Sequence, residues 1–203
     1  MIFVWYHDDP NVEPEWKPEQ IDEIMTGKWQ FYGRTEHYVN CHLQEIPENG
    51  ADIVHLNQIH SSSVFGSGGL ENRYNWFNRI LKHEWNAQWS PCPAPDQQHI
   101  SHLEMINTNK IFGIKIIEFR FNVRQIGPAY VEIHLKSDIF GGIEGVMIQM
   151  VKPIGPMRNS IIHDFYFNNS IISFIFSKFF LFAEAKMVSF SKQKKIIFSY
   201  III

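Results

Sequence analysis

The sequence predicts an α+β fold in which a helical segment precedes a group of strands and a long helix closes the chain. The 203 residues are 45% hydrophobic and 19% charged, which suits one compact domain with a core. Runs of strand length, rich in Ile, Val and Phe, lie between residues 111 and 167 and predict an antiparallel sheet. Residues 169–187 then carry a broad apolar face at helical spacing. This order of elements is typical of the α+β class.

The first sixty residues predict a strand, a linker, a strand pair and a helix. Residues 2–6 read as a strand, because they lack the basic start and cleavage site of a signal peptide. Residues 8–18 hold three prolines and many acids, which favours a linker. Residues 28–39 predict two strands that turn at Gly33, and residues 45–59 predict a helix.

The middle of the chain predicts loops around a tryptophan-rich stretch. Residues 61–69 are rich in Ser and Gly, and residues 91–95 hold three prolines, so both segments are expected to be loops. The stretch between them carries Trp76, Trp85 and Trp89. Four strands are expected after it, at residues 111–121, 129–135, 145–151 and 161–167.

Charge, cysteine content and hydropathy exclude several classes of protein. A net charge of −3 and a pI near 6.4 provide no basic field for phosphate backbones, so no nucleic-acid partner is expected. Two cysteines, Cys41 and Cys92, are too few for a disulfide framework and indicate a reducing compartment. The longest apolar run, residues 171–182, is interrupted by Lys178 and falls short of the ~20 residues of a spanning helix. No transmembrane segment is therefore predicted.

One cluster of residues carries the chemistry. Asp52, His55 and His60 place a carboxylate three residues before one imidazole and a second imidazole five residues later. Asp52 and His55 would share a helix face. His60 would lie about 140° around the helix from His55, so both rings reach one ion only if the helix ends or distorts between them.

Two imidazoles and a carboxylate, with open positions, form the facial triad of non-haem Fe(II) enzymes that activate dioxygen. The spacing alone leaves another interpretation open, in which both residues are hydrogen-bonded helix histidines. A zinc hydrolase is a further alternative, but the H-E-x-x-H spacing of that class is missing.

The residues around this cluster resemble a known family. Residues 35–38 (Thr-Glu-His-Tyr) and residues 45–57, with their Glu-Asn-Gly-Ala-Asp stretch, closely resemble the catalytic domain of the cholesterol 7-desaturases. These are Rieske oxygenases of sterol and ecdysteroid pathways. The resemblance extends through residues 138–142 and 153–156 to about Met187, and residues 61–101 resemble the family least.

The resemblance implies a role for each residue of the cluster. His55 and His60 would be ligands of a mononuclear Fe(II). Asp52 would bridge by hydrogen bonds to a Rieske-cluster histidine of a neighbouring subunit, and Asn49 would line the same approach. The implied fold is the helix-grip domain, an antiparallel sheet with flanking helices around an apolar pocket.

The resemblance also implies an activity and partners. Such an enzyme converts cholesterol to 7-dehydrocholesterol with O2 and electrons from NAD(P)H, delivered by a reductase through a Rieske [2Fe-2S] centre, in steroid hormone biosynthesis. The full-length family is expected to be homotrimeric, intracellular and associated with the endoplasmic reticulum membrane. The alternative function is a catalytically inert domain that binds a sterol or lipid.

The chain departs from the family pattern at both ends. The C-x-H and C-x-x-H pairs of a Rieske cluster are absent, and residues 1–7 resemble the closing strand of a Rieske domain. The family's third iron ligand is a carboxylate after Met187, whereas residues 188–203 hold no acid and read as translated noncoding sequence. The expected division is therefore residues 1–7, the end of a missing Rieske domain; 8–187, the iron domain, truncated at its C-terminus; and 188–203, an aberrant tail. The remaining acids weighed as the third ligand are Glu184, Asp138 and Asp164.

Overall fold

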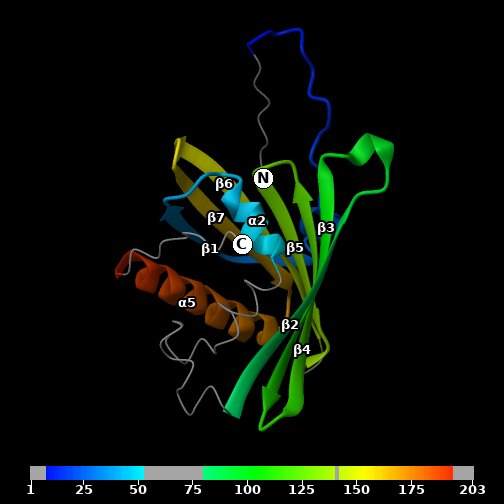
Figure 1. Cartoon of the computed structure of the whole chain (residues 1–203). Helices are drawn as coiled ribbons and strands as arrows, with labels where there is room; N and C mark the ends of the chain where they lie inside the picture. Colours follow the sequence, from blue (N-terminus) through cyan, green and yellow to red (C-terminus); the bar gives the residue numbers. More distant parts are fainter. Residues whose placement is uncertain (1–7, 53–79, 140–141, 194–203) are drawn as a thin grey trace.

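The computed structural model of the chain describes residues 8–52, 80–139 and 142–193. Within them, seven strands form one antiparallel sheet in the order β1-β7-β6-β5-β4-β3-β2 (Figure 1). The strands are β1 (Trp29–Val39), β2 (Leu81–Pro91), β3 (Ile100–Ile111), β4 (Ile114–Ile126), β5 (Tyr130–Ser137), β6 (Ile143–Gly155) and β7 (Arg158–Asn168). The helices are α1 (Asp22–Met25), α2 (Glu45–Ala51), the 3-10 turn η2 (Pro95–Gln97) and α5 (Ile171–Gln193). The predicted α+β class is confirmed.

The long helix α5 packs on one of the two faces of the sheet. Successive side chains of a strand point to opposite faces, and α5 contacts one face over β1, β7 and β6. Phe180 lies on Phe165 with ring centroids 5.6 Å apart, and Phe176 lies on Phe167 at 5.7 Å. We call this side, which includes Phe165 and Phe167, the helix face and the opposite side the back face.

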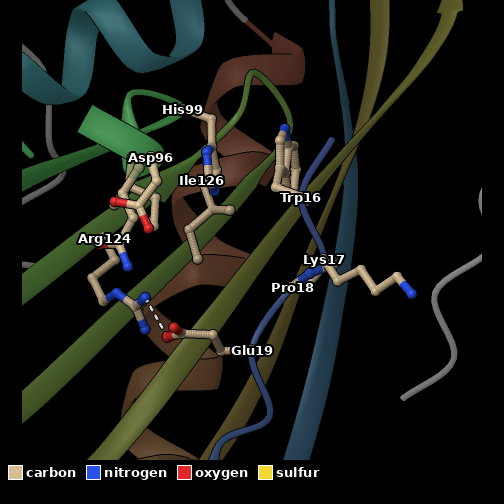
Figure 2. A pocket seen from close by; sticks show the side chains of 10 residues that line it. Trp16, Lys17, Pro18, Glu19, Asp96, His99, Arg124 and Ile126 are labelled. Carbon is tan, nitrogen blue, oxygen red and sulfur yellow. Dashed lines mark hydrogen bonds and ion pairs between the residues drawn. The ribbon is translucent and has the colours of Figure 1, made fainter. Parts of the chain in front are cut away.

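The back face is covered by the N-terminal strap, residues 13–25. Its Trp16, Ile21 and Ile24 pack on a buried cluster formed by Trp29, Ile100, Ile126, Tyr130, Val146 and Ile148. The Trp16 ring stacks on His99 at 4.6 Å, and Glu19 accepts a 2.7 Å hydrogen bond from Arg124 (Figure 2). The prediction of a mere linker over residues 8–18 is therefore wrong for Trp16, because an aromatic ring among prolines and acids can still add to a core.

Gly33 lies inside a single strand and does not turn the chain. β1 runs through it with a register irregularity between Phe31 and Gly33. The expected strand pair is wrong because this glycine makes room for packing. A Cβ at Gly33 would lie 2.7 Å from Cδ1 of Leu181 in α5, so a larger residue would force the Leu181 side chain to move, and the φ of +155° at this position also favours glycine.

The described part of the tryptophan-rich stretch forms a strand, whereas Trp76 lies outside the described residues, and a predicted strand contains a turn. Trp85 and Trp89 belong to β2, which pairs with β3 along its whole length. The strand expected at residues 111–121 is divided by a turn at Phe112 and Gly113, both of which have positive φ. Phenylalanine is not a usual turn residue, so the sequence pattern did not predict a turn at this position.

The later elements agree with prediction to within a few residues. The expected strands coincide with most of β5, β6 and β7. Each has alternating or consecutive apolar residues that are bounded by Gly-Pro or Gly-Gly. α5 extends to Gln193, beyond the predicted end at Met187. Among the residues placed by the structure, no helix is long and apolar enough to cross a membrane.

Candidate functional site

Two residues of the predicted site, Asn49 and Asp52, lie in the short helix α2 and directly after it. Asn49 is half-buried within the helix, and Asp52 follows it as an exposed C-terminal cap whose backbone N–H donates to the Glu48 carbonyl at 3.1 Å. The Asp52 backbone is extended, with φ −83° and ψ 102°. Asp52 is thus an exposed residue at the end of the helix.

The iron-ligand candidates His55 and His60 lie outside the described residues. The prediction of one helix over residues 45–59 is wrong in one respect, because α2 ends at Ala51. Gly50 in the last turn favours the early end, because glycine is a poor helix former. The argument that Asp52 and His55 share one helix face therefore does not hold. The set of two imidazoles beside an acid still suits Fe(II) in its chemistry.

The chain leaving β1 turns onto the helix face before it enters α2. Asn159 has the same orientation on β7 as Phe165, and its Nδ2 donates to the carbonyl oxygen of Cys41 at 2.8 Å. Both residues are buried. Burial raises the pKa of the Cys41 thiol, and the negative charge of Glu45 raises it further. Cys41 is therefore a neutral packing thiol that positions the start of α2.

Two histidines meet on the helix face between α5 and this turn. The rings of His37 on β1 and His163 on β7 have centroids 5.5 Å apart. His163 is only 7% exposed, and its Nε2 lies 2.9 Å from Oε1 of Gln149. In the row of β7 side chains, α5 covers Phe165 and Phe167, the Cys41 turn covers Asn159, and His163 lies between them. This pair is the polar part of the helix face closest to α2.

An apolar surface occupies the other half of the helix face, over β2 to β5. Trp85 lies 5.7 Å from Phe121, which in turn packs with the α5 cluster, so the surface continues from the helix outward. We define it as the apolar floor, made of Ala87, Leu103, Val123 and Val131 with the partly buried Met105, Phe121 and Ile133. A flat apolar ligand with few polar anchors fits such a surface.

The two hollows found among the described residues lie on the back face. The first, of about 170 Å³, is lined by strap residues, His99 and Arg124 (Figure 2). The second is an open groove of about 660 Å³ with many charged and amide side chains, among them Glu104, Arg120 and Lys136. Neither hollow is lined by residues of α2, which carries part of the predicted site, or of α5. We therefore place the candidate site on the helix face.

The three acids weighed as a third iron ligand belong to separate parts of the described chain. Asp164 points to the back face, where it is 2% exposed and accepts hydrogen bonds of 2.6 and 2.7 Å from Arg34. Asp138 is exposed after β5, and Glu184 belongs to α5. Across residues 8–52, 80–139 and 142–193, no three His, Cys, Asp or Glu side chains gather closely enough to hold a metal.

Sequence reasoning missed the pairing of His37 with His163. The sequence pattern did not single out His163, and His37 entered only through the resemblance. No local pattern could reveal the pair, because it depends on the first strand of the sheet returning to pair with the last. Two other histidines pack against neighbouring side chains: His99 stacks on Trp16, and His134 contacts the buried Glu132 at 3.3 Å.

Comparisons with known proteins agree on one family. The model described as the 3-ketosteroid 9alpha-hydroxylase C-terminal domain matches residues 4–171. Cholesterol 7-desaturase nvd of Xenopus laevis is 38% identical over 186 residues, which are 91% of this chain and 40% of that protein. Cholesterol 7-desaturase nvd 1 of Ciona intestinalis is 37% identical over 191 residues, 92% of this chain and 39% of that protein. The chain thus spans about two fifths of the length of these relatives.

A solved structure supports the fold. The chain superposes on dicamba monooxygenase bound to 3,6 dichlorosalicylic acid with a TM-score of 0.54, over 96% of this chain and 59% of the other. The sequences are only 11% identical, so this likeness concerns the fold alone. It agrees with the predicted helix-grip arrangement of an antiparallel sheet with flanking helices.

Proposed function

Because the chain belongs to the family of Rieske-oxygenase catalytic domains that includes the cholesterol 7-desaturases, we propose that it is the mononuclear-iron domain of a sterol desaturase. The family consists of oxidoreductases. The reaction proposed is the conversion of cholesterol to 7-dehydrocholesterol, as a step of steroid hormone biosynthesis. One O2, two electrons and two protons would be consumed, the sterol would lose two hydrogens, and two waters would form.

The proposed iron ligands are His55 and His60. Bound Fe(II) would supply the redox centre at which dioxygen is reduced. Asp52 and Asn49 would receive the approach of a Rieske histidine from a neighbouring subunit, and the exposed position of Asp52 at the end of α2 is compatible with that role. The third ligand remains unassigned among the acids of the chain.

The partners are proposed on the same basis. Electrons would come from NAD(P)H through a reductase and a [2Fe-2S] centre, whose paired ligands this chain does not contain. A homotrimer would bring that centre of one subunit to Asp52 of the next, and the complete enzyme would associate with the endoplasmic reticulum membrane. We propose residues 8–187 as the iron domain, residues 1–7 as the end of the preceding Rieske domain and residues 188–203 as a tail outside the family pattern.

The apolar floor is the observation that carries the sterol assignment. Its four core side chains come from four neighbouring strands and form one continuous apolar cluster, in which each residue is 5–8% exposed. The polar pair His37 and His163 lies on the same face, toward α2. A rigid sterol has one flat apolar body and one hydroxyl, and this combination of a wide apolar surface with few polar groups suits it.

An anaerobic Fe(II) titration tests the proposed metal role. We expect one Fe(II) per chain, with binding weakened about tenfold or more in His55→Ala and in His60→Ala. His102→Ala, which changes a half-buried histidine on β3, is the matched control and should bind as the unchanged chain does. Sterol binding without any iron binding would instead support the inert sterol- or lipid-binding domain, and tight zinc binding would favour the hydrolase.

A further inference from the structure

The turn between β3 and β4 holds a phenylalanine in an unfavourable backbone conformation with its side chain in solvent. Phe112 has φ +49° and Gly113 has φ +81°, as a two-residue type I′ hairpin turn requires. Asn-Gly is the usual pair at such a turn, and a bulky residue at positive φ is strained. The Phe112 side chain is 75% exposed, so internal packing does not explain its presence.

The neighbours of Phe112 extend the exposed apolar surface. Ile114 is 68% exposed, Ile116 is 55% exposed and Ile111 is 38% exposed. We call these four residues, Ile111, Phe112, Ile114 and Ile116, the apolar tip. Four large apolar side chains exposed together around one turn indicate an interaction site.

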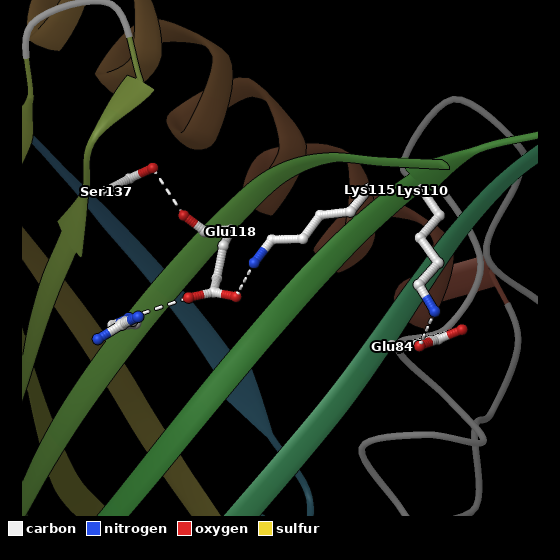
Figure 3. Close-up of polar contacts among 6 residues, drawn as sticks. Glu84, Lys110, Lys115, Glu118 and Ser137 are labelled. Carbon is white, nitrogen blue, oxygen red and sulfur yellow. Dashed lines mark hydrogen bonds and ion pairs between the residues drawn. The ribbon is translucent and has the colours of Figure 1, made fainter. Parts of the chain in front are cut away.

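The apolar tip projects beyond the body of the sheet. β4 pairs with β5 only from Arg120 onward, so residues 114–119 pair with β3 alone. The Glu118 carbonyl accepts a 2.7 Å hydrogen bond from the Ser137 hydroxyl, which anchors the hairpin at its base (Figure 3). Figure 1 shows β2 and the β3–β4 hairpin reaching past β5 at that end. The tip therefore lies at one end of the sheet, where the Phe112 backbone N–H donates to the Ile80 carbonyl at 2.9 Å and the Phe112 side chain is exposed.

Cationic side chains lie directly behind the tip. Lys110 and Lys115 face each other in register, Lys110 pairs with Glu84 at 2.6 Å, and Lys115 pairs with Glu118 (Figure 3). Lys82 and Arg120 are exposed nearby, so four cations stand against two acids around the hairpin. Long cationic side chains behind an apolar edge are suited to the lipid headgroup layer.

We propose that the apolar tip is a membrane-docking element that inserts Phe112 and its isoleucine neighbours into the surface of a lipid bilayer. The small size of the tip favours a bilayer over a protein. A stable protein interface buries about 800 Å² on each partner, which four side chains on a narrow hairpin do not supply. A bilayer accepts such a tip because insertion requires only apolar side chains and a cationic rim.

Docking would bring the domain to the lipid bilayer, in which the proposed sterol substrate dissolves. This link to a sterol rests on the proposed function, whereas insertion of the tip does not. Vesicle binding needs neither iron nor electrons, so the two proposals fail in separate experiments.

Co-sedimentation with vesicles of phosphatidylcholine and phosphatidylserine tests the proposal. Phe112→Asn suits a type I′ turn, so the fold should be kept or slightly stabilised while vesicle binding falls about tenfold. Met157→Asn is the matched control, because Met157 is 56% exposed at the opposite end of the sheet, and it should bind as the unchanged chain does. Lys110→Gln with Lys115→Gln should weaken binding to these vesicles and leave binding to pure phosphatidylcholine unchanged.

Three outcomes would overturn the proposal. The first is an unchanged chain that does not bind vesicles. The second is a Phe112→Asn variant that binds them equally well while its melting temperature shows that it is folded. The third is a concentration-dependent dimer in gel filtration that Phe112→Asn abolishes, which would assign the apolar tip to a second copy of the chain.

Discussion

His37 and His163 lie with their imidazole centroids 5.5 Å apart, although they belong to the first and last strands of the described chain. The contact exists because β1 pairs with β7, and it places two titratable rings on a face that is otherwise largely apolar. His163 is additionally bound to Gln149 on β6. The pair therefore links three adjacent strands beneath the segment that leads into α2.

The hydrogen bond between His163 and Gln149 should appear in a double-mutant cycle. His163→Phe leaves the Gln149 amide without this partner, and we expect a loss of about 1 kcal/mol in the free energy of unfolding. Adding Gln149→Leu should recover part of that loss, because an apolar pair leaves no unsatisfied group. Urea unfolding of the three variants measures both values, and strict additivity of the two substitutions would contradict the contact.

Two glycines of β6 should respond very differently to alanine. A Cβ at Gly145 would lie 2.2 Å from the Tyr166 carbonyl oxygen and 2.2 Å from Cδ1 of Phe167, whereas a Cβ at Gly155 meets nothing within 4 Å. Gly145→Ala must displace backbone of β7, so we expect a loss of about 3 kcal/mol or more, or no folded protein. Gly155→Ala should change stability by less than about 1 kcal/mol. Similar melting temperatures for the two variants would refute this account of the β6–β7 contact.

The buried thiol of Cys41 should make stability depend on alkaline pH. Its pKa is raised in the folded state by burial first and by the charge of Glu45 second. An acid with a raised folded pKa stabilises the fold below its unfolded pKa and loses that contribution as pH rises through the folded value. Stability should therefore fall as the pH rises above about 8.5, the ordinary pKa of a thiol, and Cys41→Ala should lessen the fall. A thiol reagent should also modify the half-buried Cys92 faster than Cys41, and the reverse order would contradict the burial.

Filling the apolar floor should block a sterol without changing the back face. Leu103 on β3 is 8% exposed and points to the helix face. Ile106, three residues later in the same strand, is 37% exposed and points to the back face. Leu103→Trp should weaken binding of a fluorescent sterol about tenfold, since it places a large ring on the floor. Ile106→Trp should leave it unchanged. Equal effects of the two substitutions, with circular dichroism confirming folded variants, would remove the helix face as the sterol site.

Sequence alone predicted the parts of the fold that depend on local patterns. The strands at β5, β6 and β7 were found because their apolar runs end at glycine and proline breaks. β2 was missed although Trp85, Ala87 and Trp89 alternate with charged and amide residues, as in a half-buried strand, because the glycine-rich and proline-rich segments on either side were interpreted as loops. The β3–β4 turn was missed because Phe112 occupies a position where asparagine is usual.

The candidate site was predictable only in its local part. The residues around Asp52 are consecutive in the chain, so their spacing and resemblance could be read directly, whereas His55 and His60 stay predictions. The His37–His163 pair, the Asn159–Cys41 contact and the apolar floor all join distant segments through strand pairing. Such contacts follow from sheet order and register, which the periodicity of one strand does not contain.

Product formation in a peroxide-driven reaction tests the central proposal most directly, because hydrogen peroxide supplies the oxidant and both electrons without a Rieske centre. Cholesterol and one H2O2 would give 7-dehydrocholesterol and two waters on the Fe(II)-loaded chain. We predict a sterol product two hydrogens lighter by mass spectrometry, absent in His55→Ala and retained in Phe112→Asn with detergent-dissolved cholesterol. A chain that binds Fe(II) through His55 and binds cholesterol, yet forms no such product, would contradict the account.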